Sequence, residues 1–157
     1  MGEIEMGLYD DVIEFLARVE NPKKQRMNSR KRLTRREVDK LLKKFPDAPK
    51  DYVAYLREVG AGPFRECAFA VYGFLGTLDE VLGEGVLVLR DPTTKVLCFG
   101  DNFSGDLSGF LPNSKWAVVE VLHESGSLHR VKKTFGKFIR EQMLMGPRGE
   151  DLRISKR

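Results

Sequence analysis

Apolar residues recur at helical spacing in the first third of the chain. Between residues 4 and 19 they form one face of a helix whose other face is acidic. Residues 34–45 show the same period, and Thr34 with Glu37 three positions later is a capping-box pattern. The sequence therefore predicts two amphipathic helices, and the first is expected to end at Asn21-Pro22, because proline disfavours helix in the preceding residue.

Two more helices are predicted from the same kind of pattern. Residues 49–59 carry an apolar face, with Pro49 suited to a first helical turn and Gly60 to a left-handed C-terminal position. We expect this helix to run into a flexible turn over residues 60–63. The last helix begins at Thr134 and ends before Gly146-Pro147.

Between these helices the pattern changes to short segments of β-forming residues joined by turns. The predicted strands cover residues 67–74, 86–89, 96–99, 107–111 and 116–122. Residues 91–94 are expected to form a hairpin turn that pairs the second strand with the third, and residues 77–82 a single helical turn. The fold class is therefore α+β, an antiparallel sheet of about five or six strands packed with N-terminal helices and one C-terminal helix.

The chain of 157 residues is long enough for one domain with its own core. We divide it into an acidic N-terminal helix (1–20), a basic linker or ordered loop (21–33), an α+β domain (34–146) and a C-terminal tail (147–157). The tail is expected to fray from residue 149 onward.

The net charge of +4 conceals a strong asymmetry. Residues 1–20 carry six acids and one base, whereas residues 21–45 carry eleven bases and two acids. Residues 46–157 hold fifteen of each and are neutral. The basic character of the chain therefore belongs to one segment.

The composition limits the compartment and the chemistry. No apolar run approaches the roughly 20 residues of a membrane helix, and the acidic N-terminus lacks the features of a signal peptide. We therefore expect a cytoplasmic protein that does not associate with membranes. Its two cysteines, Cys67 and Cys98, are predicted to be buried free thiols, and no cofactor is expected.

The basic segment allows two interpretations. It is either a solvated linker that neutralises the acidic first helix or a surface that contacts a polyanion, such as nucleic acid or an acidic protein. It has no interleaved aromatic residues of the kind that single-strand binders use for stacking. The candidate polyanion contacts are Lys23, Lys24, Arg26, Arg30, Lys31 and Arg32.

The stretch from Lys95 to Asp106 joins an apolar run to a turn of small and acidic residues. Such a strand-and-turn unit holds polar groups over a rigid scaffold. Asp101 and Asp106 do not have the spacing of a calcium-binding loop, so no metal site is predicted. The turn either caps its own backbone amides or contacts a partner.

Other candidate groups do not form a catalytic pattern. His123 and His129 flank a turn near Glu124, and we expect an exposed hairpin there because no activated nucleophile accompanies them. Trp116, together with Tyr72 and Phe74, either packs in the core or lines an aromatic pocket for a partner. No catalytic residue is predicted, and a hydrolase is the least favoured interpretation.

Three motifs occur in an order that resembles a known superfamily. They are Pro49-x-x-Tyr52-x-x-Tyr55-Leu56 with a glycine turn, Phe99-Gly100-Asp101…Gly105-Asp106, and Thr134-Phe135-x-x-Phe138-Ile139. This order resembles the SUKH superfamily, which includes the fungal Smi/Knr cell-wall assembly regulators, and the likeness runs from about residue 33 to 145. The chain departs from the family pattern at Ala48 and in its Gly60-Ala61-Gly62 turn.

The resemblance implies a non-catalytic fold that binds other proteins. Many bacterial members look like immunity proteins that block a toxin, and the fungal relatives are interaction hubs. We therefore expect a protein-binding domain that neutralises a toxin, with a nucleic-acid-associated module or an intracellular regulatory protein as alternatives. The oligomeric state is left open. The candidate partner contacts are Gly60, Gly62, Phe64, Asp101, Asn102, Ser104 and Asp106.

Overall fold

The computed structural model describes residues 7–154. Its α-helices are α1 (Asp10–Val19), α2 (Arg35–Lys44), α3 (Lys50–Glu58), α4 (Leu78–Leu82) and α5 (Phe135–Gln142). Its strands are β1 (Gly62–Phe64), β2 (Phe69–Gly76), β3 (Leu97–Asp101), β4 (Leu107–Leu111), β5 (Ala117–Leu122) and β6 (Ser127–Arg130). Two short 3₁₀ helices, η1 (Gln25–Asn28) and η2 (Pro112–Ser114), complete the elements.

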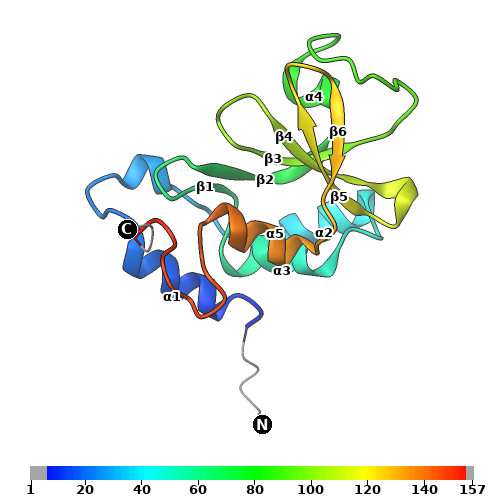
Figure 1. The fold of residues 1–157 in the computed structure, drawn as a ribbon. Coiled ribbons are helices and arrows are strands. Elements are labelled where there is room, and N and C mark those ends of the chain that lie inside the picture. Colours follow the sequence, from blue (N-terminus) through cyan, green and yellow to red (C-terminus); the bar gives the residue numbers. More distant parts are fainter. Residues whose placement is uncertain (1–6, 155–157) are drawn as a thin grey trace.

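The six strands form one antiparallel sheet in the order β1-β2-β3-β4-β5-β6, so every strand pairs with its neighbours in the chain (Figure 1). The predicted α+β class, with N-terminal helices and a C-terminal helix around an antiparallel meander, is confirmed. Antiparallel strands need no crossover, so most of them are joined by short turns, and the longer β2–β3 connection carries α4.

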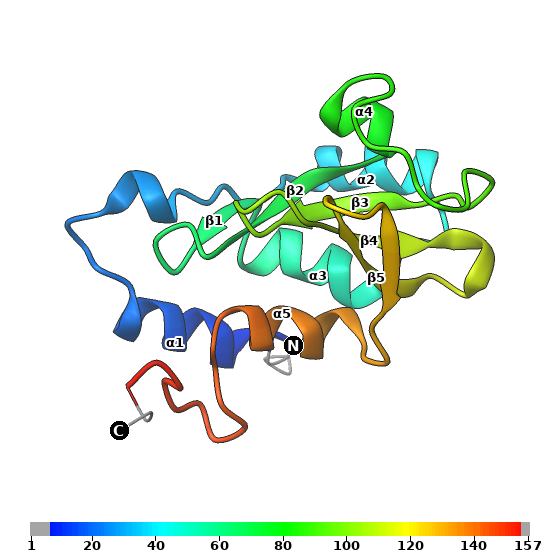
Figure 2. The same ribbon diagram turned by 45° about the horizontal axis from the view of Figure 1, so that its top comes forward.

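Both faces of the sheet are covered. Helices α1, α3 and α5 lie on one face, and α4 with residues 83–96 lies on the other (Figure 2). β3 shows why this is required: Leu97 and Phe99 pack into the large helical core, whereas Cys98 packs into a smaller cluster on the opposite face. A strand buried on both faces has an unbroken apolar run instead of alternation.

The predicted turn at residues 60–63 is wrong in part. Gly60 does adopt a positive φ of 110° at the end of α3, as expected for a helix C-terminus. Gly62–Phe64, however, form strand β1, paired with residues 69–71 of β2. Pro63 is compatible with this position because β1 is the first strand of the sheet, where a missing N–H can face away from the ladder.

The predicted strand at residues 86–89 is also wrong, and so is its hairpin with residues 96–99. Both sides of β3 are occupied, by β2 and by β4, so no free edge remains for another strand. The segment instead crosses the outer face, where Leu89 is buried while Val86 and Val88 are each 66% exposed. The Arg90 amide donates to the Gly126 carbonyl at 3.0 Å, which fixes the segment against the β5–β6 turn.

The ends of the described chain differ from expectation in two respects. The helix predicted over residues 4–19 begins only at Asp10, and residues 7–9 are not helical. In α1, Val12, Phe15 and Leu16 are buried as predicted, while Ile4 lies outside the described residues. The expected frayed tail is not seen up to Ile154: Asp151 forms a bridge to Met145. No helix within residues 7–154 has the length and apolar character needed to cross a membrane.

Candidate binding surfaces

The turn after β3 projects from one end of the sheet and is held by its own side chains. Asp101 accepts the Phe103 amide at 2.8 Å, and the side-chain oxygen of Asn102 accepts the amides of Ser104 and Asp106 at 2.9 and 3.3 Å. These bonds match the predicted capping of backbone amides. The loop is therefore a fixed protrusion, and Phe103 at its tip is exposed.

Residues of β2 and of the turn after β5 anchor this loop. The Tyr72 hydroxyl donates to Asp101 at 2.7 Å, and Asp106 accepts both the backbone amide and the ring nitrogen of His123, at 3.1 and 2.7 Å. The side-chain bond from His123 lowers the pKa of Asp106 below its usual range. His123 thus pairs with the loop, and the predicted exposed hairpin is confirmed, because β5 and β6 pair around the turn at residues 123–126 and both histidines are exposed.

The other predicted contact segment lies in the same part of the sheet but is largely covered. Pro63 of β1 and Asp101 of β3 both pair with Ala70, from opposite sides. Phe64 is fully buried, and a side chain added at Gly60 or Gly62 would collide with the backbone of residues 29–32. Of the predicted contacts, those in the Asp101–Asp106 loop reach the surface, and Gly60, Gly62 and Phe64 do not present side chains to a partner.

The basic segment is an ordered loop that lies along β1. Lys31 and Ala61 exchange two backbone hydrogen bonds, at 2.8 and 2.9 Å. Arg30 donates to the Pro63 carbonyl and forms a two-pronged ion pair with Glu20, at 2.6 and 2.7 Å. The charge of Arg30 is therefore already neutralised, in contrast to the other predicted polyanion contacts.

Ten bases of this segment and of α2 are exposed, and within residues 7–154 no acidic side chain forms an ion pair with them. We call this set the basic surface. Its members are Lys23, Lys24, Arg26, Lys31, Arg32, Arg35, Arg36, Lys40, Lys43 and Lys44. The segments that carry these bases run from η1 past β1 to the end of α2 (Figure 2).

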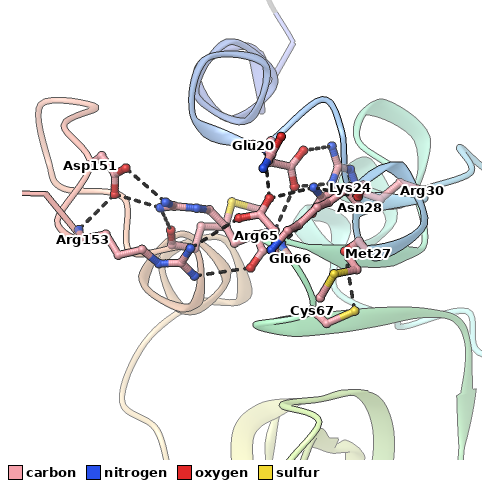
Figure 3. A network of polar contacts seen from close by, with 12 residues as sticks. Glu20, Lys24, Met27, Asn28, Arg30, Arg65, Glu66, Cys67, Asp151 and Arg153 are labelled. Atoms are coloured by element: carbon pink, nitrogen blue, oxygen red, sulfur yellow. Dashed lines mark hydrogen bonds and ion pairs between the residues drawn. The ribbon is translucent and has the colours of Figure 1, made fainter.

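A network of paired charges includes Asn28 and Arg30 of the same basic loop (Figure 3). It joins the end of α1, η1, the β1–β2 turn and the C-terminal segment. We call it the Arg65 network, and its members are Glu20, Asn28, Arg30, Arg65, Glu66, Asp151 and Arg153. Each charged group in it has an oppositely charged partner.

The network surrounds a strained turn. Arg65, Glu66 and Cys67 are three consecutive residues with left-handed φ values of 49°, 54° and 64°. Each such residue with a side chain costs about 1–2 kcal/mol. The Arg65 amide donates to Glu20 at 2.8 Å and the Glu66 amide to Asn28 at 2.7 Å, so side chains from distant segments hold the turn in this conformation.

Arg65 itself is the centre of the network. Its side chain is 3% exposed and makes two bonds to Asp151, at 2.9 and 3.1 Å, and one to the Met143 carbonyl at 2.9 Å. The guanidinium also lies over the Phe15 ring, 5.5 Å from its centre. The bond from Arg65 lowers the pKa of Asp151. These contacts explain why the C-terminal segment is ordered.

The predictions for the three aromatic residues and for the two cysteines are confirmed only in part. Trp116 packs edge-on against Phe45 and Phe110, not against Tyr72 and Phe74, which stack on each other. The pocket proposed for these three rings is therefore not formed. Cys98 is a buried free thiol whose pKa is raised by burial to about 12, whereas Cys67 is only half-buried.

No group of three or more side chains suitable for holding a metal ion is found within the described residues. Comparisons with models of known protein families, with curated proteins and with solved structures found no match. The resemblance to the SUKH superfamily therefore rests on the three sequence motifs alone.

Proposed function

We propose that this protein is a non-catalytic binding protein that engages an acidic surface of a protein partner. The observation that carries the proposal is the basic surface, whose ten exposed bases have no acidic partner in an ion pair within the described chain. Opposite potentials on two proteins speed their association and select the correct partner.

The scaffold supports this role. The basic loop is hydrogen-bonded to β1 and fixed by the Arg65 network, and α2 is held by a capping box between Thr34 and Glu37. The charges therefore stand on ordered backbone, which reduces the entropy lost on binding. The Asp101–Asp106 loop is a second rigid protrusion that a partner can contact.

The order of the three motifs supports a more specific proposal. In the SUKH superfamily this order implies proteins that bind and block toxins, so we propose that the partner is a toxin domain neutralised by coverage of its active surface. The charge of the basic surface then requires an acidic contact surface on that toxin.

Nucleic acid is the alternative, because a dense group of lysine and arginine side chains also matches phosphates. The two candidates differ in a measurable way. Non-specific binding to duplex DNA depends steeply on salt and at physiological salt falls in the range of about 10⁻⁴–10⁻⁶ M. A dissociation constant no better than about 10⁻⁴ M would exclude nucleic acid as the ligand.

The test uses the polypeptide encoded beside the gene for this chain. We expect a one-to-one complex in which any toxic activity of that polypeptide is lost. The double substitution Lys40→Glu and Lys43→Glu should weaken the complex by about tenfold or more, because it reverses two charges in the basic surface.

The matched control is Lys137→Glu, an exposed base on α5 outside the basic surface, which should leave the affinity within about twofold. Equal affinities of the double variant and the wild type would show that the basic surface does not contact the partner. Tight, salt-sensitive binding of random-sequence duplex DNA would instead identify nucleic acid as the ligand of the basic surface.

A further inference from the structure

An open groove with a volume of about 840 Å³ lies away from the Arg65 network. Three parts of the fold line it: the start of α3, the turn between η2 and β5, and the connection from β6 to α5. These segments meet at the right-hand end of α3 in Figure 2. The size falls within the range of about 300–1,000 Å³ that is usual for ligand sites.

Aromatic side chains line the bottom of the groove. Phe110 and Phe135 belong to the core, and Trp116 is half-buried with its ring 5.8 Å from that of Phe110. Lys115 and Trp116 both have left-handed φ values, 55° and 57°. Conformations of this kind are unfavourable for residues with side chains and occur often at binding sites.

The rim of the groove is positively charged. Lys115, Arg130 and Lys132 are exposed and have no acidic partner in an ion pair within residues 7–154. A fourth base, Lys133, is held by Glu141 at 2.6 Å. The rim is therefore richer in free positive than in free negative charge.

Two acids also line the groove. Asp47 is exposed, whereas the Asp51 carboxylate already accepts the backbone amides of Tyr52 and Gly136, each at 3.0 Å. These two amides belong to the first turns of α3 and α5, so the negative charge of Asp51 is balanced by helix N-termini. Asp47 is the one acid that offsets the three free bases.

We propose that the groove binds an extended peptide segment of a partner protein in which acidic residues alternate with apolar ones. The apolar side chains would contact Trp116 and Val131, which are half-buried, and the carboxylates would meet Lys115, Arg130 and Lys132. The groove is open to solvent, whereas sites for small ligands enclose most of their ligand. This site does not depend on the basic surface and would stand if that surface proved to bind nothing.

The experiment selects ligands from a library of random heptapeptides displayed on phage, against the full chain. We expect the selected peptides to contain two or more Asp or Glu residues together with an aromatic or large aliphatic residue. A selected peptide is then synthesised and titrated while the fluorescence of Trp116 is followed. Trp116 is the one tryptophan in the chain, so a saturable change reports directly on the groove.

Substitution of the rim tests the location. Lys132→Glu should weaken binding of the selected peptide by about tenfold, and Lys137→Glu, which lies outside the groove, should not. The double variant Lys40→Glu, Lys43→Glu should also bind it normally, which separates this site from the basic surface. Selection of basic or uncharged peptides, an unchanged Trp116 signal, or a stronger response to ATP than to any selected peptide would overturn the proposal.

Discussion

The Arg65 network and the basic surface use the same kinds of side chain in opposite ways. In the network, Arg30, Arg65 and Arg153 each face an acid, and Arg65 is almost fully buried. On the basic surface, ten bases face solvent without an acidic partner in an ion pair in the described chain. A buried charge must be paired, whereas an exposed charge carries no such requirement.

The difference separates structural charges from available ones. Removing a partner from the Arg65 network should affect folding, and reversing a charge on the basic surface should affect only binding. Arg30 illustrates the distinction, because sequence placed it among the polyanion contacts and its ion pair with Glu20 assigns it to the network. The predictions below test this division.

The largest effect is expected from Arg65→Met. The substitution keeps an apolar side chain over Phe15 but removes the donor of the Met143 carbonyl and leaves the Asp151 carboxylate with the Arg153 amide alone. Breaking a buried ion pair on one side typically costs about 3–5 kcal/mol. Urea unfolding should show a loss of this size in the free energy of unfolding.

The control for that measurement is Lys40→Met on the basic surface, expected to stay within about 0.5 kcal/mol of the wild type. If Arg65→Met cost less than about 1 kcal/mol, the network would not stabilise the fold, and the proposed difference between the two regions would be wrong.

A smaller effect with a pH signature is expected from Asp151→Asn, about 2 kcal/mol at neutral pH. The bond from Arg65 lowers the folded-state pKa of Asp151, so its stabilisation is complete above the unfolded value of about 4. That contribution is lost as the pH falls through the folded pKa. Unfolding curves at several pH values should therefore converge for wild type and variant in acid, and a constant difference would contradict this mechanism.

Thr34→Ala should cost about 1 kcal/mol, because the hydroxyl caps the Glu37 amide at the start of α2. Ser29→Ala is the matched control, since the Ser29 side chain is exposed and makes no hydrogen bond to any residue from 7 to 154. Thermal unfolding followed by circular dichroism measures both. Equal melting temperatures would show that α2 is held by packing alone.

The smallest change in stability is expected from Lys40→Glu, within about 0.5 kcal/mol of the wild type. The new acid would stand one turn from Arg36 and from Lys44, where opposite charges are mildly favourable in a helix. The same variant should lose part of its affinity for the partner. A loss of stability comparable to that of Arg65→Met would erase the distinction between the two regions.

Local patterns predicted most of the fold. The capping boxes, the helical periods and the turn chemistry of Asp101–Asp106 are encoded within a few residues, and the structure contains all of them. The errors arose where tertiary contacts decide. Residues 86–89 have strand composition, but β3, their expected partner, has both sides occupied. Residues 62 and 63 were predicted as part of a turn but pair with β2.

The Arg65 network could not be predicted in the same way. Arg65 and Asp151 are 86 residues apart, and Glu20 and Arg65 are 45 residues apart, so no local pattern signals the pairing. The groove beside Trp116 was missed for a similar reason, because its lining comes from three separate parts of the chain. The sequence did reveal that the bases concentrate in one segment, and it could not show which of them are already paired.

The strand order gives the sheet two unlike borders. Residues 29–31 close the border at β1 through the bonds between Lys31 and Ala61, whereas no strand of the described chain pairs with the outer side of β6. A strand from another molecule could therefore pair with this sheet only at β6. If two copies paired through their β6 strands, neither would have a free sheet edge left. Such an assembly would therefore stop at a dimer and could not grow into a fibre.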